Sequence, residues 1–148
     1  MGRLQSGGPL VSVALPAACQ GGLMEDSEYT AEDLARAVDK WRGQSRKGFL
    51  ELCILRCVQN NRRIYGFAIM EAMQRIGMDM SEGSLYPLLA RLVKEKSLLA
   101  AWETPVEGHP RKYYTLSLFG LDFLDQIERL YLADHHVYVQ LSAKGRNA

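Results

Sequence analysis

The chain has 148 residues and a formal net charge of +1, and 47% of its residues are hydrophobic while 24% are charged. This length suits one domain whose core is large enough to fold without disulfides or metal, and the composition argues against global disorder or a fibrous repeat. No apolar run reaches the ~18 residues that a membrane-spanning helix needs.

Charge is unevenly distributed along the chain. Residues 1–45 hold four basic and six acidic residues, residues 46–116 hold eleven and seven, and residues 117–148 hold three and four, which gives −2, +4 and −1. A basic middle between acidic ends is compatible with a core that binds a polyanion, although many enzymes show the same asymmetry.

The first segment, residues 1–28, is rich in glycine and proline and carries one short apolar patch that Pro16 interrupts. An export signal would have a longer apolar region and more basic charge before it. We therefore expect a flexible tail, with Met24 as an equally natural start of the protein.

An accessory helix is expected over residues 29–43. Thr30 and Asp33 form an N-terminal capping pair, and an apolar stripe that includes Trp41 follows at helical spacing. This helix should end near Gly43, and the basic stretch that follows should be a flexible link.

Two further helices follow, one over residues 48–61 and one that starts at Tyr65-Gly66 and stops at Gly77. Cys53 and Cys57 are four apart on the apolar face of the first. Because a third and a fourth ligand are missing at suitable spacing, two buried free thiols in a reducing cytoplasm are favoured over a redox or metal pair.

The helix expected over residues 81–94 is amphipathic. Its apolar side is made by Leu85, Leu88, Leu89 and Leu92, and its polar side by Ser84, Pro87, Arg91 and Lys94. Proline is tolerated only near a helix start, which favours Ser84 over Ser81 as the N-cap. Free N–H groups, a hydroxyl and a nearby arginine suit a phosphate backbone.

A β-hairpin is expected directly behind this helix. LLAAWET and RKYYTLS are rich in aromatic and β-branched residues, and the turn PVEGHP between them is polar. His109 lies near the tip, and Arg111 and Lys112 lie at the base. A basic hairpin after a recognition-type helix indicates a winged helix-turn-helix.

The last helix is expected over residues 117–143, followed by a short tail over residues 144–148. Its apolar residues lie on more than one side, which leaves a face for a partner chain. His135 and His136 are adjacent, so their rings do not share a helix face and no metal site is indicated. No arrangement typical of catalysis is present either.

From Gly48 to Gly120 the chain resembles the PadR family of transcriptional regulators. The motifs that carry the resemblance are GFLELCILRCV, IYGFAIMEAM, SEGSLYPLLARLVKEKSLL and GHPRKYYTLSLFG, in this order and spacing. The resemblance implies a homodimeric winged-helix DNA-binding protein whose C-terminal helix makes dimer contacts. Such proteins are often repressors that small aromatic or cationic effectors release. Ser97 departs from the family, which usually has glycine there.

Two sets of candidate residues follow. Contacts to DNA are expected from Tyr65, Ser84, Tyr86, Arg91, Lys94, His109, Arg111 and Lys112. A dimer interface or an effector pocket is expected from Trp41, Phe123, Leu124, Ile127, Tyr131 and Tyr138, with Trp102 as a further aromatic candidate for the pocket. Solvated surface for the first set, and ordinary core packing for the second, are the simpler alternatives.

The sequence thus predicts a mainly α protein with a small β-hairpin: a winged helix-turn-helix over residues 46–116, a C-terminal dimerisation helix and an extra N-terminal helix. We expect a cytoplasmic homodimeric repressor that binds a pseudo-palindromic operator in double-stranded DNA, without a cofactor or contact with a membrane. The alternative is a winged-helix module that binds effectors or proteins and lacks sequence-specific DNA binding.

Overall fold

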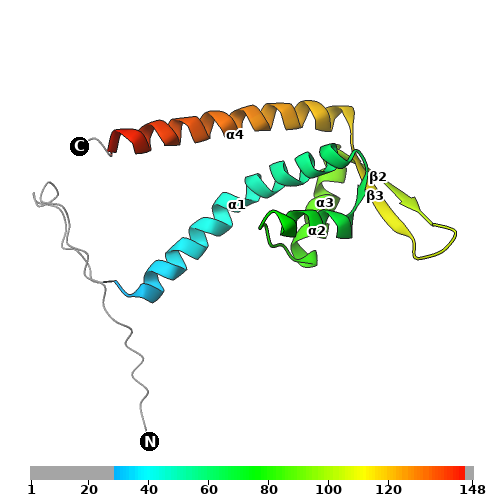
Figure 1. The fold of residues 1–148 in the computed structure, drawn as a ribbon, viewed down its shortest axis with the longest axis horizontal. Coiled ribbons are helices and arrows are strands. Elements are labelled where there is room, and N and C mark those ends of the chain that lie inside the picture. The colour runs from blue at the N-terminus through cyan, green and yellow to red at the C-terminus, as the bar shows by residue number, and fades with distance from the viewer. Residues whose placement is uncertain (1–28, 146–148) are drawn as a thin grey trace, which may run out of the picture. The chain divides into compact units, whose positions relative to one another are not determined.

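The computed structural model describes residues 29–145 (Figure 1). The tail expected over residues 1–28, with Cys19, lies outside the described residues, and so do residues 146–148. The chain divides into two compact units, residues 1–47 and residues 48–148. The second unit contains nearly all of the segment that is expected to bind DNA.

The first helix, α1, runs without a break from Ala31 to Asn61. The expected helix end near Gly43 and the flexible link after it are therefore wrong. Gly43 and Gly48 are not among the residues with positive φ. Glycine inside a helix costs only ~1 kcal/mol relative to alanine, so neighbouring helix-forming residues such as Lys40, Trp41 and Lys47 carry the helix through both positions.

The N-terminus of α1 is capped as the sequence predicts. The Thr30 hydroxyl accepts a hydrogen bond from the Asp33 amide at 3.1 Å, and the Thr30 amide donates to the Asp33 carboxylate at 3.0 Å. The hydrogen bonds from Thr30 lower the pKa of Asp33 below its ordinary value. This reciprocal pair satisfies donors that the first helical turn leaves free.

In the second unit, α2 spans Gly66–Arg75, α3 spans Glu82–Lys94 and α4 spans Leu118–Gly145. Gly77 stops α2 in the predicted way, since its φ of 81° lies in the left-handed region that favours glycine. The last helix continues past the expected end at residue 143.

A three-stranded antiparallel sheet completes the unit, with the order β1-β3-β2. The predicted hairpin is present as β2, Leu98–Glu103, and β3, Arg111–Leu116. A two-residue strand, β1, Ile64–Tyr65, pairs with β3 and was not predicted. Because β1 pairs with β3, the start of α2 is fixed to the wing, which is the hairpin formed by β2 and β3.

The core lies where the α1 segment of this unit, α2, α3, the sheet and the start of α4 meet. Its fully buried side chains include Ile54, Leu55, Val58, Ile69, Met73, Leu85, Leu89, Leu92, Leu98 and Leu124. Three leucines of the predicted α3 stripe, Leu85, Leu89 and Leu92, are thus fully buried, Leu88 is partly buried, and the opposite side of α3 stays exposed.

The turn from α3 into β2 explains how the chain accommodates serine at position 97, where glycine is usual. Lys96, with a φ of 66°, takes the left-handed conformation that ends the helix, so glycine is not required at position 97. Ser97 is buried, and its amide donates to the Leu92 carbonyl at 2.9 Å. Gly120 lies against the Ser97 carbonyl, where a Cβ atom would come within 2.0 Å of the oxygen.

Candidate nucleic-acid interface

The exposed side of α3 is the first part of the candidate interface. Ser84, Pro87, Arg91 and Lys94 are all exposed, as predicted, while the leucines behind them anchor the helix. A helix held by one apolar stripe, with its polar side free, is the form in which a recognition helix enters a major groove.

The start of α3 lies earlier than expected. The N-cap position is Ser81, and Ser84 is already inside the helix, so the prediction that Ser84 caps it is wrong. The amides of Ser84 and Leu85 both donate to the Ser81 carbonyl, at 3.0 and 2.9 Å. Pro87 therefore sits one turn and a half into the helix and leaves the Gly83 carbonyl without its usual donor. The hydroxyls of Ser81 and Ser84 lie 3.1 Å apart at the exposed end.

Tyr86 is held against the first residue of α2. A Cβ atom on Gly66 would lie 2.7 Å from Cε1 of Tyr86 and 3.1 Å from its hydroxyl oxygen. A Cβ atom at this position would require the end of the Tyr86 side chain, which is 43% exposed, to move away from α2. The Tyr65-Gly66 pair thus has a physical role, because Gly66 lets α3 present Tyr86 close to the start of α2.

Aromatic rings and cations alternate where β1 meets the wing. The Tyr65 and Tyr113 rings meet edge to face at 5.7 Å, and these two residues are partners in the β1–β3 register. The Arg111 guanidinium lies 4.7 Å from the centre of the Tyr65 ring, and that of Arg63 lies 4.0 Å from Tyr113. Cation–π contact stiffens both arginines while their charge remains at the surface.

A recess of about 480 Å³ lies where β1, the start of α2, α3 and the wing meet. Its lining comes from the start of α2, from α3 and from both strands of the wing: Tyr65, Gly66, Phe67, Tyr86, Trp102, Pro110, Arg111 and Lys112. The ammonium of Lys112 lies 6.0 Å from the centre of the Trp102 ring. Arg111 and Lys112 are neighbours in β3 and leave the strand on opposite faces, so each cation can bind a phosphate on its own side of the wing.

The structure brings together only part of the predicted DNA-contact set. Tyr65, Tyr86, Arg111 and Lys112 share the recess, and Ser84 and Lys94 lie on the exposed side of α3. His109 is exposed in the hairpin loop. Arg91 is engaged elsewhere: its guanidinium donates to Glu51 at 2.7 Å and to Glu95 at 2.8 Å.

The contacts of Arg91 change its expected role. The hydrogen bond to Glu51 raises the pKa of the guanidinium, and the bond to Glu95 adds to this shift. Two carboxylates compensate its charge, so a phosphate would have to displace one of them. The spacing along α3 places Arg91 on the free side but cannot show Glu51, which comes from α1.

Sequence reasoning missed four members of the interface. Gly66 and Phe67 line the recess, and Arg63 stacks on Tyr113. Trp102 lies in the first wing strand as predicted and lines this recess, although its proposed role was in an effector pocket. Arg63 is also paired with Glu103. The signal for Arg63 was a basic pair directly before Ile64-Tyr65, but its meaning depends on the β1–β3 pairing.

The residues expected at a dimer interface or an effector pocket divide between core and surface. Leu124 is buried in the core of its own chain, so its assignment to a partner-facing surface is wrong, and Phe123 and Ile127 pack partly against that core. Leu124 packs the start of α4 onto the core of the second unit. In contrast, Tyr131 and Tyr138 are exposed on α4, and Trp41 is exposed in the first unit.

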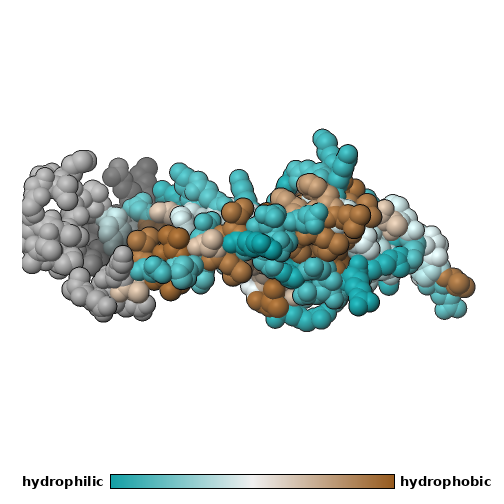
Figure 2. Space-filling view, turned by 90° about the horizontal axis from the view of Figure 1, so that it is seen from above, coloured by the Kyte–Doolittle hydropathy of each residue, from teal (hydrophilic) through white to brown (hydrophobic). Residues whose placement is uncertain are grey.

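Apolar residues crowd the exposed surface of α4 beyond its first turns. They include Leu130, Tyr131, Leu132, Val137, Tyr138, Val139 and Leu141. Figure 2, which views the molecule from the α4 side of Figure 1, shows apolar side chains in brown at the surface. Apolar surface of this extent marks an interaction site on a protein.

Two further properties concern residues 29–145. No helix in this range combines the length and the apolar character needed to cross a bilayer. Within the same range, His, Cys, Asp and Glu side chains do not gather in threes in a way that could hold a metal ion.

Comparison with known proteins agrees with this geometry. The sequence pattern described as the transcriptional regulator PadR-like family matches residues 54–126. A PadR-like transcription factor from Bacteroides fragilis is 31% identical, and the match covers 69% of this chain and 98% of that one with a TM-score of 0.60.

Other solved structures give the same result. A PadR-like transcriptional regulator from Bacillus cereus is also 31% identical, with 66% of this chain and 95% of that one covered and a TM-score of 0.58. A PadR family transcriptional regulator from Eggerthella lenta is 25% identical, with 75% and 96% covered and a TM-score of 0.67. No curated protein matches the chain.

Proposed function

Because this chain belongs to the PadR-like family of transcriptional regulators, we propose that it is a sequence-specific homodimeric repressor that binds a pseudo-palindromic operator. The observation that carries the proposal is the recess at the junction of α2, α3 and the wing, which Tyr65, Tyr86, Arg111 and Lys112 line. Binding to chromosomal DNA would place the protein in the cytoplasm.

In the proposed complex, α3 enters the major groove and the wing follows the backbone. Ser84 and Tyr86 lie on the first turns of α3, where a recognition helix reaches base edges. Arg111 and Lys112 are the phosphate-binding cations, and the hydroxyl of Tyr65 adds a neutral donor beside them. The charge of +4 over residues 46–116 supports this assignment, because counterion release dominates affinity for duplex DNA.

Dimerisation through α4 completes the proposal. The exposed leucine, valine and tyrosine residues of α4 offer a surface that a second copy of the helix can cover. A two-fold dimer would place two recognition helices about 34 Å apart, which is one turn of DNA. The operator would then have two related half-sites at that spacing.

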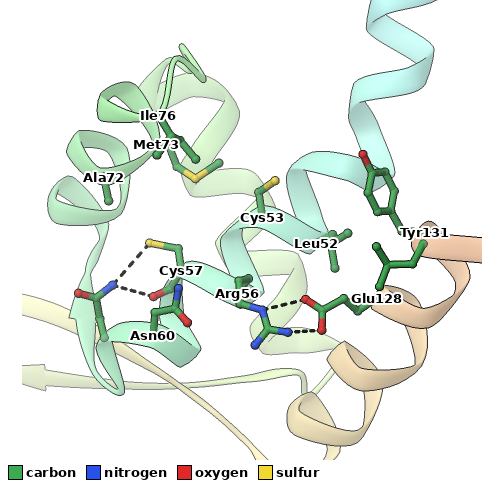
Figure 3. Close-up of a pocket in the computed structure, with 12 residues that line it drawn as sticks. Leu52, Cys53, Arg56, Cys57, Asn60, Ala72, Met73, Ile76, Glu128 and Tyr131 are labelled. Atoms are coloured by element: carbon green, nitrogen blue, oxygen red, sulfur yellow. Dashed lines mark hydrogen bonds and ion pairs between the residues drawn. The ribbon is translucent and has the colours of Figure 1, made fainter. Parts of the chain in front are cut away.

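Release by a small effector is the final part of the proposed function. An apolar hollow of about 430 Å³ lies in the second unit, and Tyr131 is among its lining residues. This volume is within the range of ~300–1,000 Å³ that is typical of small-molecule sites. Its walls come from α1, from α2 and its C-cap, and from α4 (Figure 3), so a bound molecule would touch both the helix-turn-helix unit and the proposed dimerisation helix.

Fluorescence anisotropy with a labelled duplex from the promoter beside its own gene tests the proposal. We expect tight binding that falls steeply as salt rises, and a matched duplex with scrambled half-sites should bind at least ~1,000-fold more weakly. If the protein binds neither duplex, or binds both equally, the alternative of a winged-helix interaction module is favoured.

A further inference from the structure

One arginine on the exposed side of α3 is already engaged by the protein itself. Nη2 of Arg91 donates to Oε2 of Glu51 at 2.7 Å, and Nη1 donates to Oε2 of Glu95 at 2.8 Å. Glu51 lies on α1, and Glu95 is the C-cap residue of α3. Arg91 therefore binds two carboxylates on the exposed side of α3 that also carries Ser84, where the proposed complex places DNA.

The two carboxylates differ in how firmly they hold the guanidinium of Arg91. The Glu51 side chain is 15% exposed, whereas that of Glu95 is 47% exposed and belongs to an i, i+4 pair. An exposed pair at this spacing contributes little, because water screens the attraction. A shielded carboxylate keeps more of its attraction, and the hydrogen bond to Glu51 is the largest cause that raises the pKa of Arg91. Glu51 is therefore the main partner.

The surroundings of Glu51 favour a lasting pair with this arginine. Glu51 immediately precedes Leu52, a core residue of α1, and most of its side chain is shielded from water. A carboxylate shielded in this way is costly without a cation beside it. The pair should therefore persist in the free protein, and a phosphate of DNA has to compete with a carboxylate that is already in place.

Competition of this kind affects DNA binding without regard to sequence. Phosphate contacts carry no sequence information, and each of them adds to the affinity for any duplex through counterion release. A cation that is withheld from phosphate lowers this shared affinity, while the proposed base contacts from Ser84 and Tyr86 are unaffected. Because other sites in a genome greatly outnumber the operator, less protein is then held on the wrong DNA.

We propose that Glu51 is a positioning residue: it holds the guanidinium of Arg91 away from phosphate and so limits the affinity of the protein for DNA of arbitrary sequence. This inference rests on the proposed function, because it requires α3 to meet DNA. Glu95 assists from the same helix, but a phosphate can displace this exposed partner. Without Glu51, Arg91 becomes one more phosphate-binding cation in addition to Arg111 and Lys112.

Fluorescence anisotropy with a scrambled duplex, measured over a range of salt concentrations, tests the role of Glu51. Glu51→Ala should bind this duplex several-fold more tightly at low salt, and the slope of log affinity against log salt should become steeper by about 0.9, which corresponds to one added phosphate contact. A change that acts only on fold stability would leave this slope unchanged. Glu51→Gln should move the slope in the same direction by a smaller amount, because its amide oxygen still accepts a hydrogen bond but carries no charge.

Asp125→Ala is the matched control for net charge. Asp125 pairs with Arg129 on α4 at 3.0 Å, so its replacement makes the same change in net charge and frees an arginine outside the candidate interface. Its salt slope should equal that of the unsubstituted protein. The double variant Glu51→Ala with Arg91→Ala should lose the gain in affinity and in slope, because the cation that makes the added contact is gone.

Circular dichroism of each variant shows whether it is folded, and Glu51→Gln decides the test if the alanine variant is not. An unchanged slope in a folded Glu51 variant, a steeper slope that survives the loss of Arg91, or an equal gain in Asp125→Ala would overturn the proposal. Any of these results would leave the proposed function intact. If the unsubstituted protein binds no duplex at all, the proposed function fails and the role of Glu51 fails with it.

Discussion

Gly66→Ala is the perturbation for which the structure gives the sharpest expectation. The added Cβ atom would lie 2.7 Å from Cε1 of Tyr86, and an ordinary contact begins near 3.4 Å, so the ring edge must move by about 0.7 Å. Tyr86 lies on the exposed side of α3, so this movement changes what the helix offers to DNA. Alanine forms helix better than glycine by up to ~1 kcal/mol, which limits the loss of fold stability.

The expected loss is in operator affinity. A base or phosphate contact is worth about 1–3 kcal/mol, so displacement of Tyr86 should weaken binding by about 5- to 150-fold. Fluorescence anisotropy with the operator duplex measures this loss. Gly48→Ala is the matched control, because a Cβ atom on Gly48 has no neighbour within 4 Å. Its operator affinity should equal that of the unsubstituted protein.

A double-mutant cycle identifies the cause. In a Tyr86→Ala background the ring is gone, so Gly66→Ala should change affinity by less than about twofold. If Gly66→Ala weakens binding equally with and without the tyrosine ring, Gly66 acts through some other contact. The reasoning about Tyr86 would then be refuted.

Three further predictions concern the wing, α4 and the contact between α1 and α4. Lys112→Ala should lower the slope of log affinity against log salt by about one and leave sequence preference unchanged; an unchanged slope would show that Lys112 does not touch phosphate. Tyr138→Asp combined with Leu141→Asp should give monomers in sedimentation at concentrations where the unsubstituted protein is a dimer, and persistent dimers would place the interface elsewhere. Arg56→Met and Glu128→Leu should show a coupling of about 1 kcal/mol in a denaturation cycle, because both groups are part-buried; strictly additive losses would exclude a stabilising pair.

Periodicity predicts the local structure of this chain well. Three of the four leucines in the α3 stripe are fully buried, the two wing strands form, and Gly77 ends α2, because each of these features depends on neighbours within a few residues. The helix end expected near Gly43 was wrong because the neighbouring residues outweigh the glycine. A single glycine is a weak stop when the residues on both sides continue to favour helix.

The parts that sequence could not predict depend on contacts between distant residues. Strand β1 has only two residues, and its pairing with β3 decides that Tyr65 meets Tyr113. Arg91 has the right position for DNA, yet Glu51, forty residues earlier, holds it. Leu124 continues the apolar pattern of α4, and the pattern alone does not say whether its own core or a second chain covers it.

Site-specific photocrosslinking tests most directly whether α3 and the wing contact the same duplex. A photoreactive amino acid replaces Ser84 on α3, Lys112 on the wing, or Gln140 on α4 as the control, and each protein is irradiated with the operator. We expect crosslinks from positions 84 and 112 to neighbouring nucleotides of one half-site and none from position 140. Crosslinking from only one of the two sites, or from neither while the operator remains bound, would contradict the account.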